Sequence, residues 1–189
     1  MSSNYWDGWY QKGDAPVVSS QFAVMVAQHA QHARNVSRIV DFGCGNGRDT
    51  VLLDMVAPTL GVDASPEAVR AASERLPHIS FVCGSVEKIT GAPGLLYARF
   101  LLHSLTEDVE DMLLDRVRGW QVAFEFRTPE DVNLPKVTPE HYRRAVDPDL
   151  LVDKLEGRGF KVTYRVEGRG MARWGDDDAH VCRLMAHSL

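Results

Sequence analysis

The residues with the clearest chemical pattern lie in the segment VDFGCGNGRD, residues 40–49, where glycines stand at three alternate positions behind an apolar run. Glycine has no side chain, so such a stretch can turn sharply and lets another molecule approach the backbone closely. One acid, Asp41, lies just before the glycines, and a second, Asp63, follows at the end of the next apolar run. The pattern predicts a ligand site between a strand end and a helix start.

The spacing of the glycines narrows the class of ligand. It is G-x-G-x-G, at Gly43, Gly45 and Gly47, whereas a dinucleotide fingerprint has the spacing G-x-G-x-x-G. A carboxylate at the end of the second strand, where Asp63 lies, can accept hydrogen bonds from both hydroxyls of a ribose. The sequence therefore disfavours a nicotinamide dinucleotide. A tight turn in a domain without any nucleotide ligand stays open as the alternative.

Alternating strands and helices must position these residues. Runs rich in β-branched and aromatic residues predict strands at 38–43, 59–65, 79–85, 94–100, 121–128, 160–167 and 179–188. Capping residues and prolines predict helices between them, at 19–34, 47–56, 66–75, 104–117 and, with starts at Thr138-Pro139 and Asp147-Pro148, up to about residue 157. This order predicts an α/β fold with a mostly parallel sheet and a late antiparallel hairpin.

Composition and charge set limits on the function. The 189 residues are 44% hydrophobic and 25% charged, which predicts one globular domain over 1–189, with 1–37 as a helical lid or entry segment and 38–189 as the α/β core. A net charge of -5 argues against nucleic acid as a partner. The three cysteines form no metal-binding spacing and no signal peptide or membrane-spanning run is apparent, so a cytoplasmic protein without a metal is predicted.

The three segments VDFGCGNGRD, LGVDASPEAV and FVCGSVEKI resemble the class I S-adenosylmethionine-dependent methyltransferases, over most of residues 36–128. The resemblance implies an enzyme with S-adenosylmethionine as cofactor and a Rossmann-like, seven-stranded sheet with helices on both faces. It implies that the glycine loop holds the methionine end, that Asp41 orients the loop and the amino group, and that Asp63 holds the ribose. The cofactor residues expected on this basis are Asp41, Gly43, Cys44, Gly45, Gly47, Asp63, Ala64, Ser85, Val86 and Tyr97, with Cys44 as a packing residue and Ser85 and Val86 at the adenine.

The acceptor of the methyl group should lie beyond the fourth and fifth strands. His103 could remove a proton near neutral pH, and Glu125 and Arg127 share one face of strand five; these three are the predicted catalytic residues. Arginines can bind a phosphate or carboxylate, and the predicted substrate residues are Arg99, His141, Tyr142 and Arg143, with the HYRR stretch at 141–144 expected on a helix. A solvated or hydrogen-bonded histidine and a structural network of salt bridges are the alternatives for these groups.

A narrower resemblance, to small bacterial methyltransferases associated with polysaccharide or secondary-metabolite genes, rests on YWDGWY, SSQFA, YARFLLHSL, EFRT, HYRR and DDDAHVCRLMA. It implies a small polar acceptor such as a sugar, methylated on oxygen, and adds Gln21 and Phe22 as contact residues. The aromatic residues Trp6, Trp9 and Tyr10 either close over the site or form the apolar face of a helix docked on the core.

Several alternatives for the function stay open at this point. The chain could bind the cofactor without catalysis, as a partner or sensor module, or methylate the nitrogen of a small amine. A NAD-dependent reductase is disfavoured by the glycine spacing, and a nucleic-acid methyltransferase by the charge and by YARFLLHSL in strand four. The acceptor, the methylated atom and the oligomeric state are not fixed by the sequence.

Overall fold

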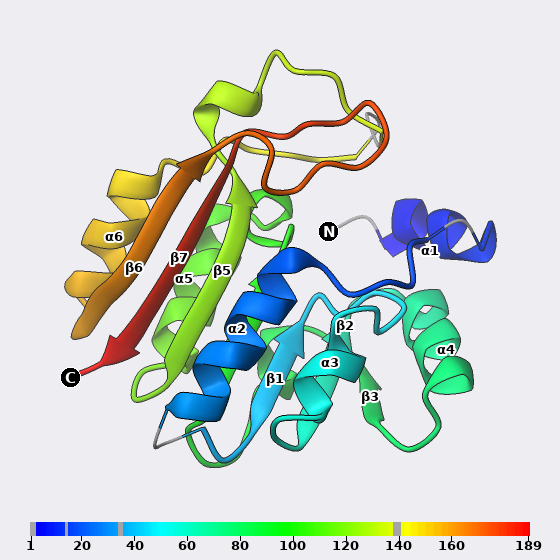
Figure 1. The fold of residues 1–189 in the computed structure, drawn as a ribbon, viewed down its shortest axis with the longest axis horizontal. Helices are drawn as coiled ribbons and strands as arrows, with labels where there is room; N and C mark the ends of the chain where they lie inside the picture. Colours follow the sequence, from blue (N-terminus) through cyan, green and yellow to red (C-terminus); the bar gives the residue numbers. More distant parts are fainter. Residues whose placement is uncertain (1–2, 14, 34–35, 138–140) are drawn as a thin grey trace.

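The computed structural model describes residues 3–13, 15–33, 36–137 and 141–189. One seven-stranded sheet runs through the molecule, with the strand order β3-β2-β1-β4-β5-β7-β6 (Figure 1). The strands are β1 (Ile39–Phe42), β2 (Thr59–Asp63), β3 (Ser80–Cys83), β4 (Leu95–Arg99), β5 (Gln121–Arg127), β6 (Phe160–Gly168) and β7 (Val181–Ser188). Strands β1 to β5 pair in parallel and β7 pairs antiparallel with both β5 and β6. The predicted Rossmann-like sheet with its antiparallel hairpin is confirmed.

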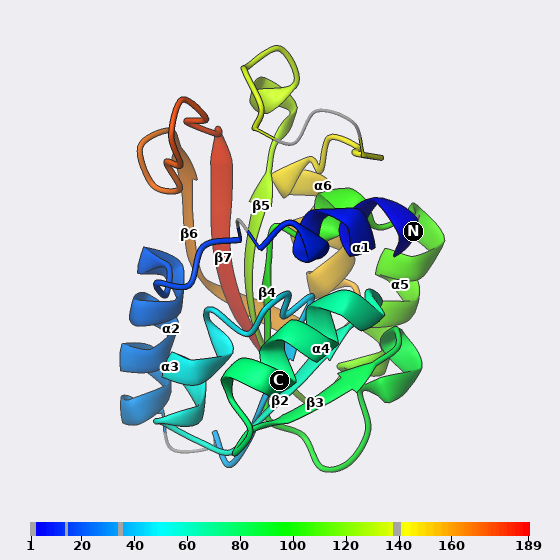
Figure 2. The same ribbon diagram turned by 90° about the vertical axis from the view of Figure 1, so that its right-hand side faces the viewer.

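Helices cover both faces of this sheet. The longer helices are α1 (Ser3–Gln11), α2 (Gln21–His32), α3 (Thr50–Asp54), α4 (Pro66–Arg75), α5 (Glu107–Arg116) and α6 (Pro148–Glu156). Short 3-10 turns are η1 (Val86–Lys88), η2 (Leu102–Ser104) and η3 (Pro129–Asp131). Figures 1 and 2 show α2 and α3 on one face and α5 and α6 on the other. None of the helices in the described part of the chain is long and apolar enough to span a bilayer.

Two apolar cores result because successive residues of a strand point to opposite faces of the sheet. Val122 and Phe124 of β5 pack with α5 and α6 in the larger core, whereas Ala123 between them packs with α2 and α3 in the smaller one. Phe22 of α2 stacks on Tyr97 of β4 with ring centroids 5.2 Å apart, and both side chains are buried. These layers fix the carboxyl ends of the parallel strands, where the predicted ligand residues lie.

Helix starts follow the capping signals in most places. Ser65 accepts the amide of Ala68 at the start of α4, and Thr106 accepts the amide of Val109 at the start of α5. Asp147 caps α6. Each cap satisfies an amide that the first helical turn leaves unpaired.

The prediction of a helix over the HYRR stretch, residues 141–144, is wrong. Residues 141–146 are not helical, and α6 begins only at Pro148. Asp147 precedes a proline and is extended, as the proline ring requires. The amide of Arg144 donates to the carbonyl of His103 at 2.9 Å, so this segment pairs with the η2 turn and not with itself. The other predicted start, Thr138-Pro139, lies outside the described residues.

Candidate functional site

A cavity opens at the carboxyl ends of β1, β2, β4 and β5, and α1 lies across this edge of the sheet (Figures 1 and 2). Most of the predicted site residues line it. They are Asp41, Gly43, Cys44, Gly45, Asp63, Ala64, Ser85, Tyr97, Arg99, His103, Arg127, His141 and Arg143. Segments up to about a hundred residues apart in the sequence therefore meet at one place, as expected for an open α/β sheet.

Four predicted residues are not part of the cavity wall. Gly47 faces Leu76 and Phe81, and Val86 belongs to the larger apolar core. Glu125 is fully buried behind the wall, and Tyr142 is exposed to solvent. Of the two residues named by the narrower resemblance, Phe22 is also buried in the core, on Tyr97.

The glycine loop is bound to the end of the second strand. Gly43 and Gly45 have φ angles of 81° and 55°, in the left-handed region that other residues adopt at a cost. Asp63 accepts the amide of Gly45 on Oδ2 and the amide of Ser65 on Oδ1, each at 2.9 Å. A side chain at Gly45 would run into the hydroxyl of Tyr10 from α1. The loop therefore presents bare backbone to the cavity, and Asp63 holds it in place.

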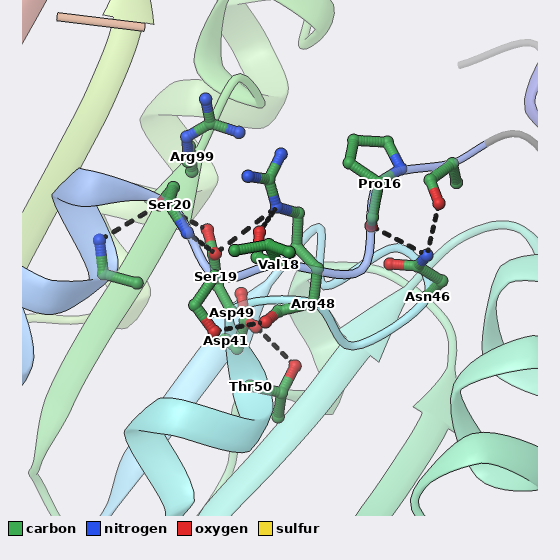
Figure 3. Close-up of polar contacts among 12 residues, drawn as sticks. Pro16, Val18, Ser19, Ser20, Asp41, Asn46, Arg48, Asp49, Thr50 and Arg99 are labelled. Atoms are coloured by element: carbon green, nitrogen blue, oxygen red, sulfur yellow. Dashed lines mark hydrogen bonds and ion pairs between the residues drawn. The ribbon is translucent and has the colours of Figure 1, made fainter.

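Two further carboxylates lie at the end of β1 and the turn that follows (Figure 3). Asp41 accepts the hydroxyl of Thr50 at 2.6 Å, and burial, only partly offset by this bond, raises its pKa to about 8. Asp49 accepts three hydrogen bonds, from the amide and hydroxyl of Ser20 and from the hydroxyl of Tyr97. Asp41 thus keeps a carboxyl group available for a cationic ligand, whereas Asp49 joins α2 to the loop.

The cysteine of the loop has no features of a nucleophile. Cys44 is 5% exposed, and burial followed by the charges of Asp63 and Asp41 raises the pKa of its thiol well above the usual range. The thiol is therefore protonated at neutral pH, as suits a packing residue. Among the described residues, no group of three or more histidine, cysteine or acidic side chains is arranged to hold a metal ion.

The cavity wall at the carboxyl ends of β4 and β5 is built around Phe100. Its φ of 52° makes it the one non-glycine residue with a positive φ in the described chain, and such a conformation costs about 1–3 kcal/mol. The guanidinium carbons of Arg99 and Arg127 lie 4.4 and 5.2 Å from its ring centroid. His103 meets the same ring edge-on at 5.8 Å. The strained backbone thus directs an aromatic ring between two cations.

His103 is buried and neutral. Burial, followed by the charges of Arg127 and Arg143, lowers the pKa of its imidazole well below the usual range. The backbone amide of Arg127 donates to Nδ1 at 3.4 Å, so the ring proton lies on Nε2. In this tautomer Nε2 of His103 is a hydrogen-bond donor, and His103 is among the residues that line the cavity.

Buried ion pairs hold the two predicted arginines. Arg99 donates from Nε to Glu125 at 2.7 Å, and the second oxygen of Glu125 accepts from Arg183 at 2.6 Å. Arg127 donates to Asp131 at 2.7 Å and to Asp177 at 2.5 Å. Glu125 therefore positions arginines from behind the wall.

Some lining residues carried no local signal in the sequence. Asn46 holds the linker after α1 through the carbonyls of Ala15 and Pro16, and Trp174 meets Trp9 at a centroid distance of 5.7 Å. Asp177 and Ser104 also line the cavity, and each has one buried oxygen without a hydrogen-bond partner among the described residues. Trp174 and Asp177 reach the site only through the fold, whereas Asn46 and Ser104 lie within the segments VDFGCGNGRD and YARFLLHSL, next to residues that were predicted.

Helix α1 packs across the mouth of the cavity. The hydroxyl of Ser65 donates to Asp7 at 2.5 Å, and Trp6, Trp9 and Tyr10 all line the cavity. Burial, followed by the charge of Asp63, raises the pKa of Tyr10 well above its usual range. The aromatic face of this helix is therefore directed at the ligand site, and the helix also packs against α4.

Comparisons with known proteins agree with this arrangement. Residues 39–120 match the model of a methyltransferase domain family. Trans-aconitate 2-methyltransferase of Deinococcus radiodurans is 32% identical over 78 residues, which are 39% of this chain and 30% of that protein. The chain spans about three tenths of the length of the curated relatives it matches.

Solved structures share the fold along most of the chain. A TehB-like S-adenosylmethionine-dependent methyltransferase from Corynebacterium glutamicum superposes with a TM-score of 0.70 at 17% identity, over 100% of this chain and 98% of that one. Magnesium protoporphyrin IX methyltransferase from Synechocystis, determined with bound S-adenosylmethionine, has a TM-score of 0.65 at 16% identity, over 89% and 79%. At 16–17% sequence identity, these similarities show a shared fold and no more.

Proposed function

We propose, on the premise that residues 39–120 form a class I S-adenosylmethionine-dependent methyltransferase domain, that this chain transfers a methyl group to an oxygen atom of a small polar acceptor. When bound, S-adenosylmethionine supplies a methyl group on a positively charged sulfur. The protein's part is to align the acceptor, exclude water and, where needed, hold or accept a proton.

One observation carries the cofactor half of the proposal: the glycine loop and the acids Asp41 and Asp63 meet in a single cavity at the strand ends. Gly43 and Gly45 line the cavity, so the methionine portion can approach their backbone there, with Leu101 and Tyr10 packed against the same glycines. Asp41 has a carboxyl oxygen for the amino group, and Asp63 lies where a ribose hydroxyl can donate to it. Ser85 and Ala64 continue the wall toward the adenine side.

The acceptor half is supported by the polar wall around Phe100. Arg99, Arg127, Arg143 and His103 line it, which favours an acceptor with negative or hydrogen-bonding groups. His103 is neutral, as a general base must be, but its proton on Nε2 supports a role in orienting the acceptor better than one in removing a proton. The relatives named trans-aconitate 2-methyltransferase make a polycarboxylate a reasonable first acceptor to test, beside sugars.

Calorimetry with S-adenosylhomocysteine tests the cofactor site. We expect the wild type to bind, and Asp63→Ala to bind at least tenfold more weakly, about 1.4 kcal/mol, because the ribose loses its acceptor and the loop loses its anchor. Asp63→Asn keeps the size of the side chain in case the alanine variant fails to fold. Glu74→Gln, at an exposed position on α4, is the matched control. Unchanged affinity in both Asp63 variants would contradict the ribose assignment.

An assay of methyl transfer over a panel of polycarboxylates, sugars and small amines tests the acceptor half. Product with an oxygen acceptor supports the proposal, and His103→Ala should then lower turnover while the affinity for S-adenosylhomocysteine stays within about twofold. Methylation of amines alone would favour the nitrogen alternative. A protein that binds the cofactor but methylates no member of the panel would favour a non-catalytic module.

A further inference from the structure

Two arginine side chains, Arg48 and Arg99, stand together in the wall of the cavity although they come from the turn after β1 and the end of β4. Figure 3 shows both guanidinium groups directed to the same side, above the hydrogen bonds that join Ser20 to Asp49. Each arginine is close enough to the other that Arg99, after burial, contributes to a lowered pKa of Arg48. Two like charges placed side by side indicate that a negative group completes the arrangement.

Within the part of the chain that the structure describes, these two arginines donate hydrogen bonds from their Nε atoms alone. Arg48 donates from Nε to the carbonyl of Val18 at 2.9 Å, and its nearest carboxylate, Asp49, is 3.6 Å from the same atom. Arg99 donates from Nε to Glu125 at 2.7 Å. Among the described residues, no hydrogen-bond partner is found for the Nη atoms of either side chain. Four N–H-bearing nitrogens therefore remain for a ligand.

The acids around the pair cannot supply that partner. Asp49 already accepts three hydrogen bonds from Ser20 and Tyr97. Glu125 divides its two oxygens between Arg99 and Arg183. Asp41, with its pKa raised to about 8, is mostly uncharged at pH 7. Three arginines, Arg48, Arg99 and Arg183, thus share the carboxyl groups of Asp49 and Glu125.

The setting favours a planar anion over a solvated counter-ion. The side chain of Arg99 is 16% exposed and that of Arg48 is 25% exposed, so water screens their charges only in part. A guanidinium group offers paired N–H donors in a fixed plane, which match the two oxygens of a carboxylate. Contacts at Nε fix both side chains before the anion arrives, so little side-chain entropy is lost on binding.

We propose that Arg48 and Arg99 form a carboxylate-binding pair in this cavity, an inference that rests on the function proposed above. The carboxylate has two possible sources, the methionine portion of the cofactor and an anionic acceptor. Both sources use the same Nη donors, and the experiment separates them.

The experiment compares the binding of three probes by calorimetry in the wild type, Arg48→Gln and Arg99→Gln. S-adenosylhomocysteine contains the methionine carboxylate, whereas 5′-methylthioadenosine keeps the adenosine and sulfur but lacks the amino-acid part. Citrate, titrated into the protein loaded with S-adenosylhomocysteine, stands for an anionic acceptor. Arg70→Gln, on the exposed surface of α4, is the matched control for loss of a positive charge.

If the pair holds the cofactor, each variant should lose at least tenfold in affinity for S-adenosylhomocysteine, with the affinity for 5′-methylthioadenosine kept within twofold. If it holds the acceptor, the variants should keep S-adenosylhomocysteine affinity and lose at least tenfold for citrate. Arg48→Gln leaves the buried Glu125 pairs intact, so it remains informative even if Arg99→Gln fails to fold.

Three results would overturn the inference. The first is unchanged affinity for S-adenosylhomocysteine and citrate in the variants, the second is an equal loss for S-adenosylhomocysteine and 5′-methylthioadenosine, and the third is an equal loss in Arg70→Gln. A wild type that binds no S-adenosylhomocysteine would instead overturn the proposed function, and the inference with it.

Discussion

At the scale of single residues, the three acids of the site, Asp41, Asp49 and Asp63, differ in the hydrogen bonds that they accept. Both oxygens of Asp49 accept hydrogen bonds, from Ser20 and Tyr97. Asp63 holds the glycine loop with Oδ2, through the amide of Gly45, and accepts the amide of Ser65 on Oδ1. Asp41 has one hydrogen bond from Thr50, and its pKa is raised to about 8. Burial favours the neutral form of a carboxyl group. It raises the pKa of Asp63 as well, but there backbone amides, led by that of Ser65, oppose it. Asp41, with its single hydrogen bond, is therefore the acid whose charge a bound cation would change most.

This difference predicts a pH dependence of cofactor binding. If an ammonium group binds at Asp41, the ionised carboxylate is the competent form, and binding below pH 8 must release a proton. Affinity for S-adenosylhomocysteine should then rise with pH, by up to about tenfold per unit between pH 6 and 7.5, and level off near pH 8. Calorimetry across this range checks the slope. Asp41→Asn should bind more weakly at pH 8 and show a much smaller slope, and a slope equal to that of the wild type would contradict the assignment.

The sequence allowed some of these residues to be predicted and hid others. Asp41, Gly43, Gly45 and Asp63 lie in one strand-turn-helix-strand stretch, whose spacing has a direct physical meaning. Asp177 and Trp174 come from the loop between β6 and β7 and reach the cavity only after the sheet has formed. No periodicity relates that loop to the glycines, so its residues could not be assigned from the chain alone.

At the scale of elements, strands and caps were predicted well because their signals are local. Each of the seven strands was expected within a few residues, since β-branched runs bounded by glycine have few alternatives. The error at 141–146 arose where two cap-and-proline signals follow each other closely. The segment uses its hydrogen bonds on the η2 turn, with Arg144 donating to His103 and Leu105. Tertiary pairing thus overrides a local helix signal.

The close packing of β2 against β3 predicts that Gly61, in β2, is needed for the stability of the fold. A Cβ atom at Gly61 would lie 2.6 Å from Cε1 of Phe81 and 3.1 Å from the sulfur of Cys44. We expect Gly61→Ala to lower the free energy of unfolding by about 1–3 kcal/mol through overpacking, measured by urea denaturation.

A matched control exists in α1. Gly8 has nothing within 4 Å of the position of an added Cβ, so Gly8→Ala should not destabilise the protein and should favour its helix by about 0.5–1 kcal/mol. Equal losses of stability in the two variants would argue against the packing explanation.

At the scale of the whole molecule, one sheet connects the cofactor half to the acceptor half. Strand β5 is paired with β4 on one side and with β7 on the other, so the site spans elements that belong to the same hydrogen-bonded layer. We therefore propose that residues 38–189 unfold as a single cooperative unit together with α2, whose Phe22 is buried in the smaller core. A ligand that binds at the strand ends should then stabilise the entire fold.

This predicts a large thermal shift with the cofactor product. S-adenosylhomocysteine at one hundred times its dissociation constant should add about 2.7 kcal/mol, which for a chain of this size corresponds to a rise in Tm of about 5–11 °C. Differential scanning calorimetry measures the shift and the number of transitions. NADH at the same concentration is the control and should leave Tm unchanged. A second unfolding transition whose temperature does not change with the ligand would contradict the single cooperative unit.

Under the proposed function, the position of α1 has a consequence for the rate of turnover. Asp7 is tied to Ser65, Trp9 meets Trp174, and Tyr10 stands over Gly45, so the helix touches several separate parts of the cavity rim at once. Under the proposed function, α1 would lie over the bound product and would have to move before the product leaves. Movement of α1 and release of the product would then limit the rate of each catalytic cycle. Acceptors that differ in chemical reactivity would be methylated at the same maximal rate.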